Sequence, residues 1–175
     1  MEPLSSGRLT LGGGQGQINP NEGFVPGNDG AYGVALDADR NVYLTGWTYS
    51  VDFPTRNAMQ PHLADAADGD ADSFITKLNA TGDQLVFSTY FGGADGTDVG
   101  RGIAVDKNNN VYVVGYTNSF AFPTTKPIQG EIDGRTAHFN SSQYFDAYLA
   151  KIDASGQSGS IPLTSAVISM TSPSG

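Results

Sequence analysis

Two short segments carry side-chain oxygens at a spacing that could bind a hard cation. The D-x-[DN]-x-[DN] spacing of calcium loops occurs twice, at Asp37, Asp39 and Asn41 and again at Asp106, Asn108 and Asn110. Alternate side chains on a tight loop can direct their oxygens at one calcium ion, but the central glycine and the distal glutamate of such loops are missing here. Because Asx side chains also hydrogen-bond backbone N–H groups, the sequence favours structural turns, with calcium at these residues as the alternative.

A second group of carboxylates crowds one short stretch. Its members are Asp65, Asp68, Asp70 and Asp72. A cation site is one interpretation, and a solvated acidic loop is the one we favour. Only Asp72 recurs later in the chain, as Asp146, so we expect it to cap the entry to a strand or to pair with the recurring Lys77 or Lys151.

Trp47 and Tyr116 are aromatic residues at matching places in two related segments. Stacking on sugars would give one binding site for each segment, whereas packing between structural units would give none. We favour packing, because large aromatic side chains usually contribute burial. The histidines, His62 and His138, do not occupy matching positions, and neither lies in a recognisable catalytic or metal-binding context. An active site is needed once, whereas the polar residues here recur, so we expect no enzyme.

A long internal repeat must position these residues. Tyr32–Pro54 is repeated as Arg101–Pro123 with a constant offset, so that Gly33 matches Gly102. A period of this length indicates a stacked repeat architecture, in which each unit covers the apolar face of its neighbour.

Each repeat contains short runs rich in Val, Ile, Tyr, Phe and Thr, which predict strands. The expected strands are Tyr32–Leu36, Val42–Thr48, Ser73–Leu78 and Leu85–Phe91 in the first unit, and Arg101–Val105, Val111–Thr117, Ala147–Ile152 and a degenerate one near Ser160–Met170 in the second. No segment has a sustained 3.6-residue period, so we expect almost no helix. Several strands are apolar on both faces, which predicts four-stranded antiparallel β-propeller blades packed face to face.

The repeat also divides the chain. We expect residues 1–28 to hold the last strand of a preceding blade, at Leu9–Gly13, and a Gly/Pro-rich loop at 14–28. The first blade repeat then covers 29–97, the second covers 98–170, and 171–175 form a tail. The second unit is five residues longer, and we expect the insertion in a surface loop at 131–145.

The motifs resemble the SBBP family, a bacterial β-propeller repeat of the seven-bladed type. They are the A-V-D-x-x-G-N-x-Y-V-T-G-x-T core at Ala35–Thr48, the F-P-T element at Phe53–Thr55, the D-A-F-V-x-K-L element at Asp72–Leu78 and the L-x-Y-S-T-Y-L-G-G element at Leu85–Gly93. The glycine usual before the Asn of the core is replaced by Arg40 and by Asn109. The resemblance implies a propeller in a secreted or cell-surface bacterial protein, with no catalytic residues to transfer.

Composition limits the partners. The 175-residue chain has a net charge of −9, which disfavours nucleic acid and anionic membranes, and no apolar run long enough to span a bilayer. The first ten residues lack the features of a signal peptide, so we expect any export signal to lie outside this chain. Two blades cannot close a ring. We therefore expect other blades as partners, from a longer chain or from homo-oligomer copies.

The hypothesis from the sequence is a non-catalytic scaffold or a protein- or glycan-interaction module without a cofactor. The alternative is a lectin-like or calcium-dependent ligand-binding propeller. Loss of sugar binding without loss of folding in alanine variants of Trp47 and Tyr116 would favour the lectin alternative.

Overall fold

The computed structural model describes residues 11–19, 23–64, 69–119, 121–123, 145–156 and 166–168. Within these ranges the regular structure is entirely β, as the sequence predicts. None of the described residues forms a helix of the length and apolarity needed to cross a membrane.

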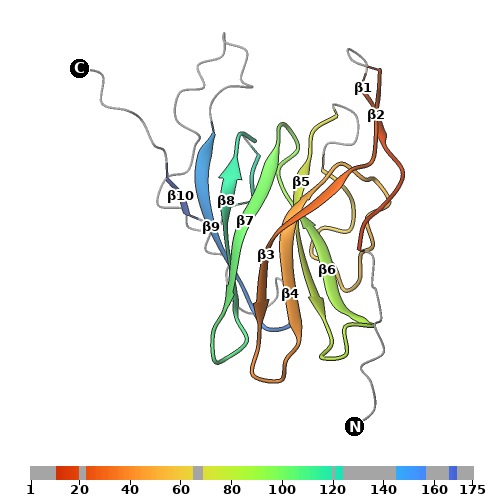
Figure 1. Cartoon of the computed structure of the whole chain (residues 1–175). Helices are drawn as coiled ribbons and strands as arrows, with labels where there is room; N and C mark the ends of the chain where they lie inside the picture. The colour runs from red at the N-terminus through yellow and green to blue at the C-terminus, as the bar shows by residue number, and fades with distance from the viewer. Residues whose placement is uncertain are drawn as a thin grey trace, which may run out of the picture.

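The described strands form two four-stranded antiparallel sheets and one hairpin (Figure 1). The first sheet, blade 1, has the order β3-β4-β5-β6, and the second, blade 2, has the order β10-β9-β8-β7. Blade 1 consists of β3 (Asp29–Leu36), β4 (Val42–Thr48), β5 (Asp72–Leu78) and β6 (Leu85–Phe91). Blade 2 consists of β7 (Asp98–Val105), β8 (Val111–Thr117), β9 (Asp146–Ile152) and β10 (Ala166–Ile168). The all-β blade architecture is therefore confirmed, including a short last strand within the predicted 160–170 window.

The first strand of each blade starts three residues earlier than predicted. The pairing register of β3 with β4 shifts between Ala31 and Gly33, and that of β7 with β8 shifts at the matching place, between Gly100 and Gly102. A bulge adds a residue to one strand and interrupts the side-chain alternation. The sequence pattern therefore marked only the part of each strand that follows the bulge.

The segment before blade 1 differs from the prediction. The expected loop 14–28 contains a hairpin of β1 (Gln17–Asn19) and β2 (Gly23–Val25). Residues 11–13, the described part of the expected Leu9–Gly13 strand, have no strand structure. The expectation for that strand is therefore wrong in its described part. The predicted insertion at 131–145 lies outside the described residues except for Phe145.

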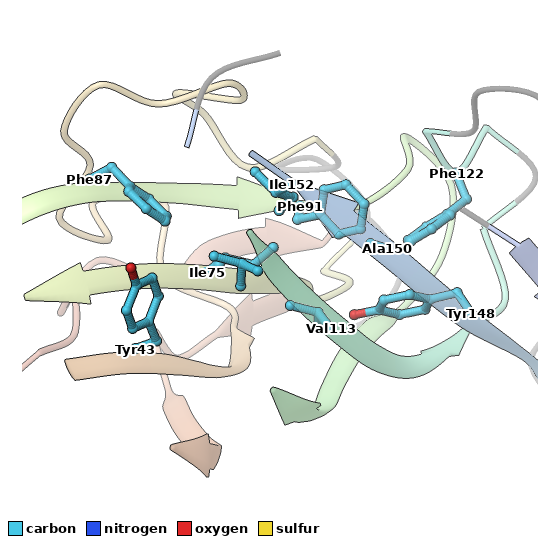
Figure 2. Packing of buried hydrophobic residues seen from close by; sticks show 10 residues of the cluster. Tyr43, Ile75, Phe87, Phe91, Val113, Phe122, Tyr148, Ala150 and Ile152 are labelled. Atoms are coloured by element: carbon cyan, nitrogen blue, oxygen red, sulfur yellow. The ribbon is translucent and has the colours of Figure 1, made fainter. Parts of the chain in front are cut away.

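The core lies between the two blades, where β7 packs across β3 and β4 (Figure 1). Figure 2 shows side chains from both sheets meeting in this layer. Its buried members are Tyr43, Ile75, Phe87 and Phe91 from blade 1 and Val111, Val113, Phe122, Tyr148, Ala150 and Ile152 from blade 2 and its loop. This packing explains why strands of these sheets are apolar on both faces, because one face of each blade is buried against the other blade.

A smaller cluster lies on the opposite face of blade 1. Phe53, Leu63, Phe74 and Tyr90 are buried there, and Leu11 packs against them. Leu11 takes the place that the repeat pattern assigns to Phe91, which packs against blade 2 in the same way. Residues before blade 1 therefore cover the face of blade 1 that points away from blade 2. In the same way, the last strand of blade 1 covers the face of blade 2 that points toward blade 1.

Candidate functional site

An aromatic pocket of about 200 Å³ lies at the junction of the two blades. Its lining residues are Tyr32, Trp47, Tyr49 and Ala71 from blade 1 and its loops, and Thr97, Val99 and Tyr116 from blade 2 and the connection before it. The pocket therefore exists only where the two repeats meet.

The strand registers bring Trp47 and Tyr116 to the same end of their blades. Trp47 on β4 is opposite Gly30 on β3, and Tyr116 on β8 is opposite Val99 on β7. A Cβ atom at Gly30 would lie 2.6 Å from the indole Nε1 of Trp47, so the absence of a side chain at Gly30 is what lets the indole lie against the β3 backbone. Tyr49 holds the indole from another side, with ring centroids 5.4 Å apart in an edge-on arrangement.

Arg101 joins the aromatic residues across the junction. Its guanidinium lies 4.3 Å from the ring centroid of Tyr32 on blade 1 and 5.2 Å from that of Tyr116 on blade 2. Its Nη2 also donates a hydrogen bond of 3.3 Å to the hydroxyl of Tyr116. The arginine side chain is exposed, so these contacts form the solvent-facing border of the site.

This geometry differs from the alternative of one aromatic sugar site for each unit, which the sequence offered beside the favoured interpretation of packing between units. Trp47 and Tyr116 occupy matching positions in the repeats, yet both line one pocket, because β7 of blade 2 packs across β3 and β4 of blade 1. Sequence reasoning did not identify Tyr32, Tyr49 or Arg101. Tyr32 and Arg101 hold matching repeat positions but differ in chemistry, so the repeat pattern gave no signal that they would meet.

The two Asx-rich segments form structural turns. Asp37 Oδ1 accepts hydrogen bonds from the backbone N–H groups of Asp39 and Asn41, at 3.0 and 2.9 Å. Its Oδ2 accepts from the side-chain amide of Asn41 at 2.8 Å and the hydroxyl of Tyr43 at 3.1 Å. Lys77 Nζ lies 3.3 Å from the same oxygen. The hydrogen bonds of a structural turn are therefore present at this segment.

Hydrogen bonding also sets the charge of Asp37. Burial alone would raise the pKa of its carboxyl, but the hydrogen bonds from Asn41, Lys77 and Tyr43 together lower it to about 2. The carboxylate is therefore held ionised by donors of its own chain.

The second turn repeats these contacts. Asp106 accepts from the backbone N–H groups of Asn108 and Asn110 and from the side chains of Asn110 and Tyr112. Hydrogen bonds from Asn110, the largest cause, lower the pKa of Asp106. In the described part of the chain, no three His, Cys, Asp or Glu side chains gather as a metal ion would require.

A departure from the family motif gains a physical meaning in these turns. Arg40 and Asn109, which replace the usual glycine, have φ angles of 66° and 62°. This left-handed region is adopted without steric cost only by glycine. The position of the motif glycine therefore requires a left-handed backbone conformation, and this chain keeps that conformation with Arg40 and Asn109 in place of glycine.

The crowded carboxylates before β5 separate into different roles. Asp65 and Asp68 lie outside the described residues, while Asp70 accepts a hydrogen bond from Thr97 Oγ1 at 2.9 Å. Asp72 is buried and accepts from the backbone N–H of Ala64 at 2.9 Å. This bears out the expected capping role at the strand entry. Of the two lysines named as alternative partners, Lys77 contacts Asp37 and Lys151 lies over the ring of Tyr112.

A polar motif that the sequence did not reveal lies where one blade connects to the next. The backbone N–H of Gly93 and the Oγ of Ser119 both donate 2.8 Å hydrogen bonds to Asp98 Oδ2. A Cβ atom at Gly92 would lie 2.4 Å from Asp72 Oδ1 and 2.7 Å from Asp98 Oδ2, so the bare backbone of Gly92 fits between two carboxylates. The spacing of the Gly-Gly pair to Asp98 was the available signal.

The same motif precedes blade 1. Gly13 N–H donates to Asp29 Oδ2 at 2.9 Å, and Ser50 Oγ donates to the same oxygen at 3.1 Å. Gly13 therefore has the role of Gly93, although the residues around it form no strand.

Asp98 differs from Asp29 in its surroundings. Its side chain is fully buried, and its Oδ2 accepts the hydrogen bonds from Gly93 and Ser119. Burial raises the pKa of Asp98 to about 8, against the hydrogen bonds from Thr117, Gly93 and Ser119, and the nearby Asp72 carboxylate adds to the rise. The raised pKa favours the protonated carboxyl of Asp98 in the folded chain, and the motif connects one blade to the next.

Comparison with known families agrees with the repeat architecture. Residues 86–121 match the family model SBBP, described as a beta-propeller repeat. The match runs from β6 of blade 1 through the Gly92–Gly93 junction and β8 into the loop that follows β8, which confirms the resemblance inferred from the sequence motifs. No curated protein matches the chain.

Proposed function

We propose that this chain, which carries a β-propeller repeat and is built as a structural repeat module, binds a saccharide in the aromatic pocket between its blades. The observation that carries the proposal is the meeting of Trp47 and Tyr116, from two repeats, in one pocket with Tyr32 and Tyr49. The proposed activity is binding without catalysis, which agrees with the generally non-catalytic character of this repeat family.

The shape and chemistry of the pocket support a small cyclic ligand. Pockets that enclose drug-sized ligands measure about 300–1,000 Å³, so about 200 Å³ suits a single sugar ring. Aromatic rings offer an apolar face to the C–H groups of a sugar, while tyrosine hydroxyls offer hydrogen bonds at the border. Both kinds of group occur here, in Trp47, Tyr49 and Tyr116.

The charge of Arg101 favours a neutral or acidic ligand over a cationic one. A box of aromatic rings is also the arrangement that binds quaternary ammonium groups. In this chain the guanidinium of Arg101 already lies over the rings of Tyr32 and Tyr116, so a second cation would meet its positive charge. A neutral or acidic saccharide has no such conflict, and the carboxylate of a uronic acid would pair with Arg101.

The proposal also includes a place outside the cell, on a bacterial surface or in a secreted protein. Its support is the resemblance of the motifs to the bacterial repeat family. Detection of the full-length protein in cell-surface and culture fractions, against a cytoplasmic marker, tests this part.

Titration with glucose, N-acetylglucosamine and glucuronic acid tests the binding proposal. Trp47 is the only tryptophan of the chain, so its fluorescence reports directly on the pocket. We expect saturable quenching or a spectral shift with at least one sugar. Calorimetry should then show the binding reduced at least tenfold in Tyr116→Ala and retained in Tyr116→Phe.

Tyr112→Phe is the control, because Tyr112 lies on the same strand as Tyr116 and does not line the pocket. Circular dichroism verifies that each variant is folded. The absence of any saturable change at sugar concentrations of tens of millimolar, or equal binding by Tyr116→Ala, would refute the proposal.

A further inference from the structure

Blade 2 exposes a face whose counterpart on blade 1 is buried. On blade 1, Thr45 and Ile75 are fully buried because blade 2 covers them. Their repeat counterparts on blade 2 are Val114 and Leu149, which are 48% and 39% exposed. We call these two residues, with Ala147 beside Leu149 on β9, the trailing face of blade 2.

Blade 1 also exposes a face, and the matching face of blade 2 is the one that packs against blade 1 in the junction between the two blades. On blade 2, Ile103 and Val105 of β7 pack against the core between the blades. Their counterparts on β3 are Val34 and Leu36, which are 67% and 61% exposed. We call these two residues the leading face of blade 1.

We propose that the trailing face of blade 2 binds the leading face of blade 1 in a second copy of this chain. The internal junction between blades supplies the template, since the two exposed faces are the repeat counterparts of its two halves. Contact between them removes four large exposed apolar side chains from water, and large exposed apolar patches mark interaction sites.

The polar residues of the internal junction are replaced as a pair on the two exposed faces, which supports the proposed contact between them. In the internal junction, the buried hydroxyl of Tyr148 on blade 2 donates a 3.0 Å hydrogen bond to Ser73 Oγ on blade 1. The repeat counterpart of Tyr148 is Phe74 on β5 of blade 1, on the same side of the sheet as the leading face. The repeat counterpart of Ser73 is Ala147 on the trailing face of blade 2. Both polar partners are thus replaced together, so a junction between copies leaves neither group unsatisfied.

The junction between copies differs from the internal one in spacing. Gly100 approaches Thr45 so closely that a Cβ atom there would lie 2.1 Å from Thr45 Oγ1. The matching residues between copies are Ala31 and Val114, which are larger, so the strands must lie farther apart at this point. The contact therefore depends chiefly on Val34, Leu36 and Leu149, away from Ala31.

The proposed contact is heterologous, because one copy uses its leading face and the other its trailing face. Heterologous contacts form rings when the rotation closes. Since propellers contain about four to eight blades, two to four copies with two blades each would close one. A closed ring covers the leading face and the trailing face of every copy.

Light scattering on a size-exclusion column at 0.5 M salt, which screens the net charge of −9, tests the proposal. We expect a discrete species of two to four times the 18.3 kDa chain mass. The variants Val34→Asp and Leu149→Asp should each be monomeric, because each lacks one working face. Both positions are exposed in the single chain, so the fold should survive, as circular dichroism would verify.

Mixing the two variants gives the sharper result. The Val34→Asp copy retains its trailing face and the Leu149→Asp copy its leading face, so the mixture should form a dimer and nothing larger. Gln84→Asp, which adds the same charge at an exposed turn between β5 and β6, should associate as the original chain does.

Three outcomes would overturn the proposal. They are a monomeric original chain at 100 μM, an oligomer unaffected by either substitution, and a mixture that stays monomeric. In the first case the exposed faces would belong to contacts with blades of a longer chain, and the saccharide proposal would remain unaffected.

Discussion

Asp98 makes the stability of this fold depend on pH in a direction opposite to that of most aspartates. Its pKa is raised from 3.8 to about 8 in the folded chain, because the carboxyl is fully buried at the blade junction. A raised folded pKa means that its contribution to stability is fully present below about pH 4 and is lost as the pH rises toward 8. Replacing Asp98 with Asn removes the ionisable group while keeping the shape.

The size of the effect follows from the two pKa values. Between pH 4 and 8 the folded chain holds a proton that the unfolded chain has released, which costs about 1.4 kcal/mol for each pH unit. At pH 7, about three units above the unfolded pKa, the cost is about 4 kcal/mol. That is a large part of the roughly 5–15 kcal/mol that stabilises a domain.

Urea unfolding of the original chain and of Asp98→Asn at pH 5, 6, 7 and 8 measures this cost. We expect the free energy of unfolding of the variant to fall with pH less steeply, by about 1 kcal/mol per unit. The slope is the decisive quantity, because an asparagine N–H₂ without an acceptor would lower stability by about 1–3 kcal/mol at every pH.

Asp29→Asn provides the matched comparison, since Asp29 occupies the same motif at a partly exposed position. It measures the loss of hydrogen bonding without deep burial. Equal pH slopes for the original chain and Asp98→Asn would refute the reasoning, because they would mean that Asp98 is ionised in the folded chain.

Three further predictions concern turns and the blade junction. Arg40→Gly should raise the free energy of unfolding by about 1 kcal/mol in urea, because the φ of 66° strains any residue with a Cβ; an unchanged or lower value would contradict this. Millimolar calcium should leave the melting temperature unchanged, since the oxygens of Asp37 already accept donors of the chain, whereas a rise that disappears in Asp37→Ala would establish the calcium alternative. Tyr148→Phe should lower the free energy of unfolding by about 1–3 kcal/mol in the same urea assay, because Ser73 loses its buried hydrogen-bond partner. The double variant with Ser73→Ala should recover part of this loss. Equal stability of the original chain and both variants would count against a contribution from this hydrogen bond.

The sequence by itself determined the blades. The 69-residue offset and the Val-, Ile- and Tyr-rich runs predicted the strands of both sheets, and five of them coincide with the observed ones to within one residue. These features are local or repeated, so they can be read along the chain. The first strand of each blade was predicted too short, because a bulge disrupts the alternation that marks a strand.

The turns could also be predicted from the sequence. The hydrogen bonds that form each turn join Asp37 and Asp106 to residues two to six positions away, within the same short segment; Lys77, which also contacts Asp37, comes from another strand. The calcium spacing is the same pattern of oxygens, and only the observed donors distinguish a hydrogen-bonded turn from a metal loop.

Only the tertiary structure decided how the repeats meet. Trp47 and Tyr116 line one pocket, and Arg101 contacts Tyr116 of its own repeat and Tyr32 of the other repeat. Repeat analysis aligns such residues as equivalents and so places them in separate sites. The burial of Asp98 likewise depends on the sheet stacked beside it, because burial is a property of the neighbouring blade and not of the residue's own segment.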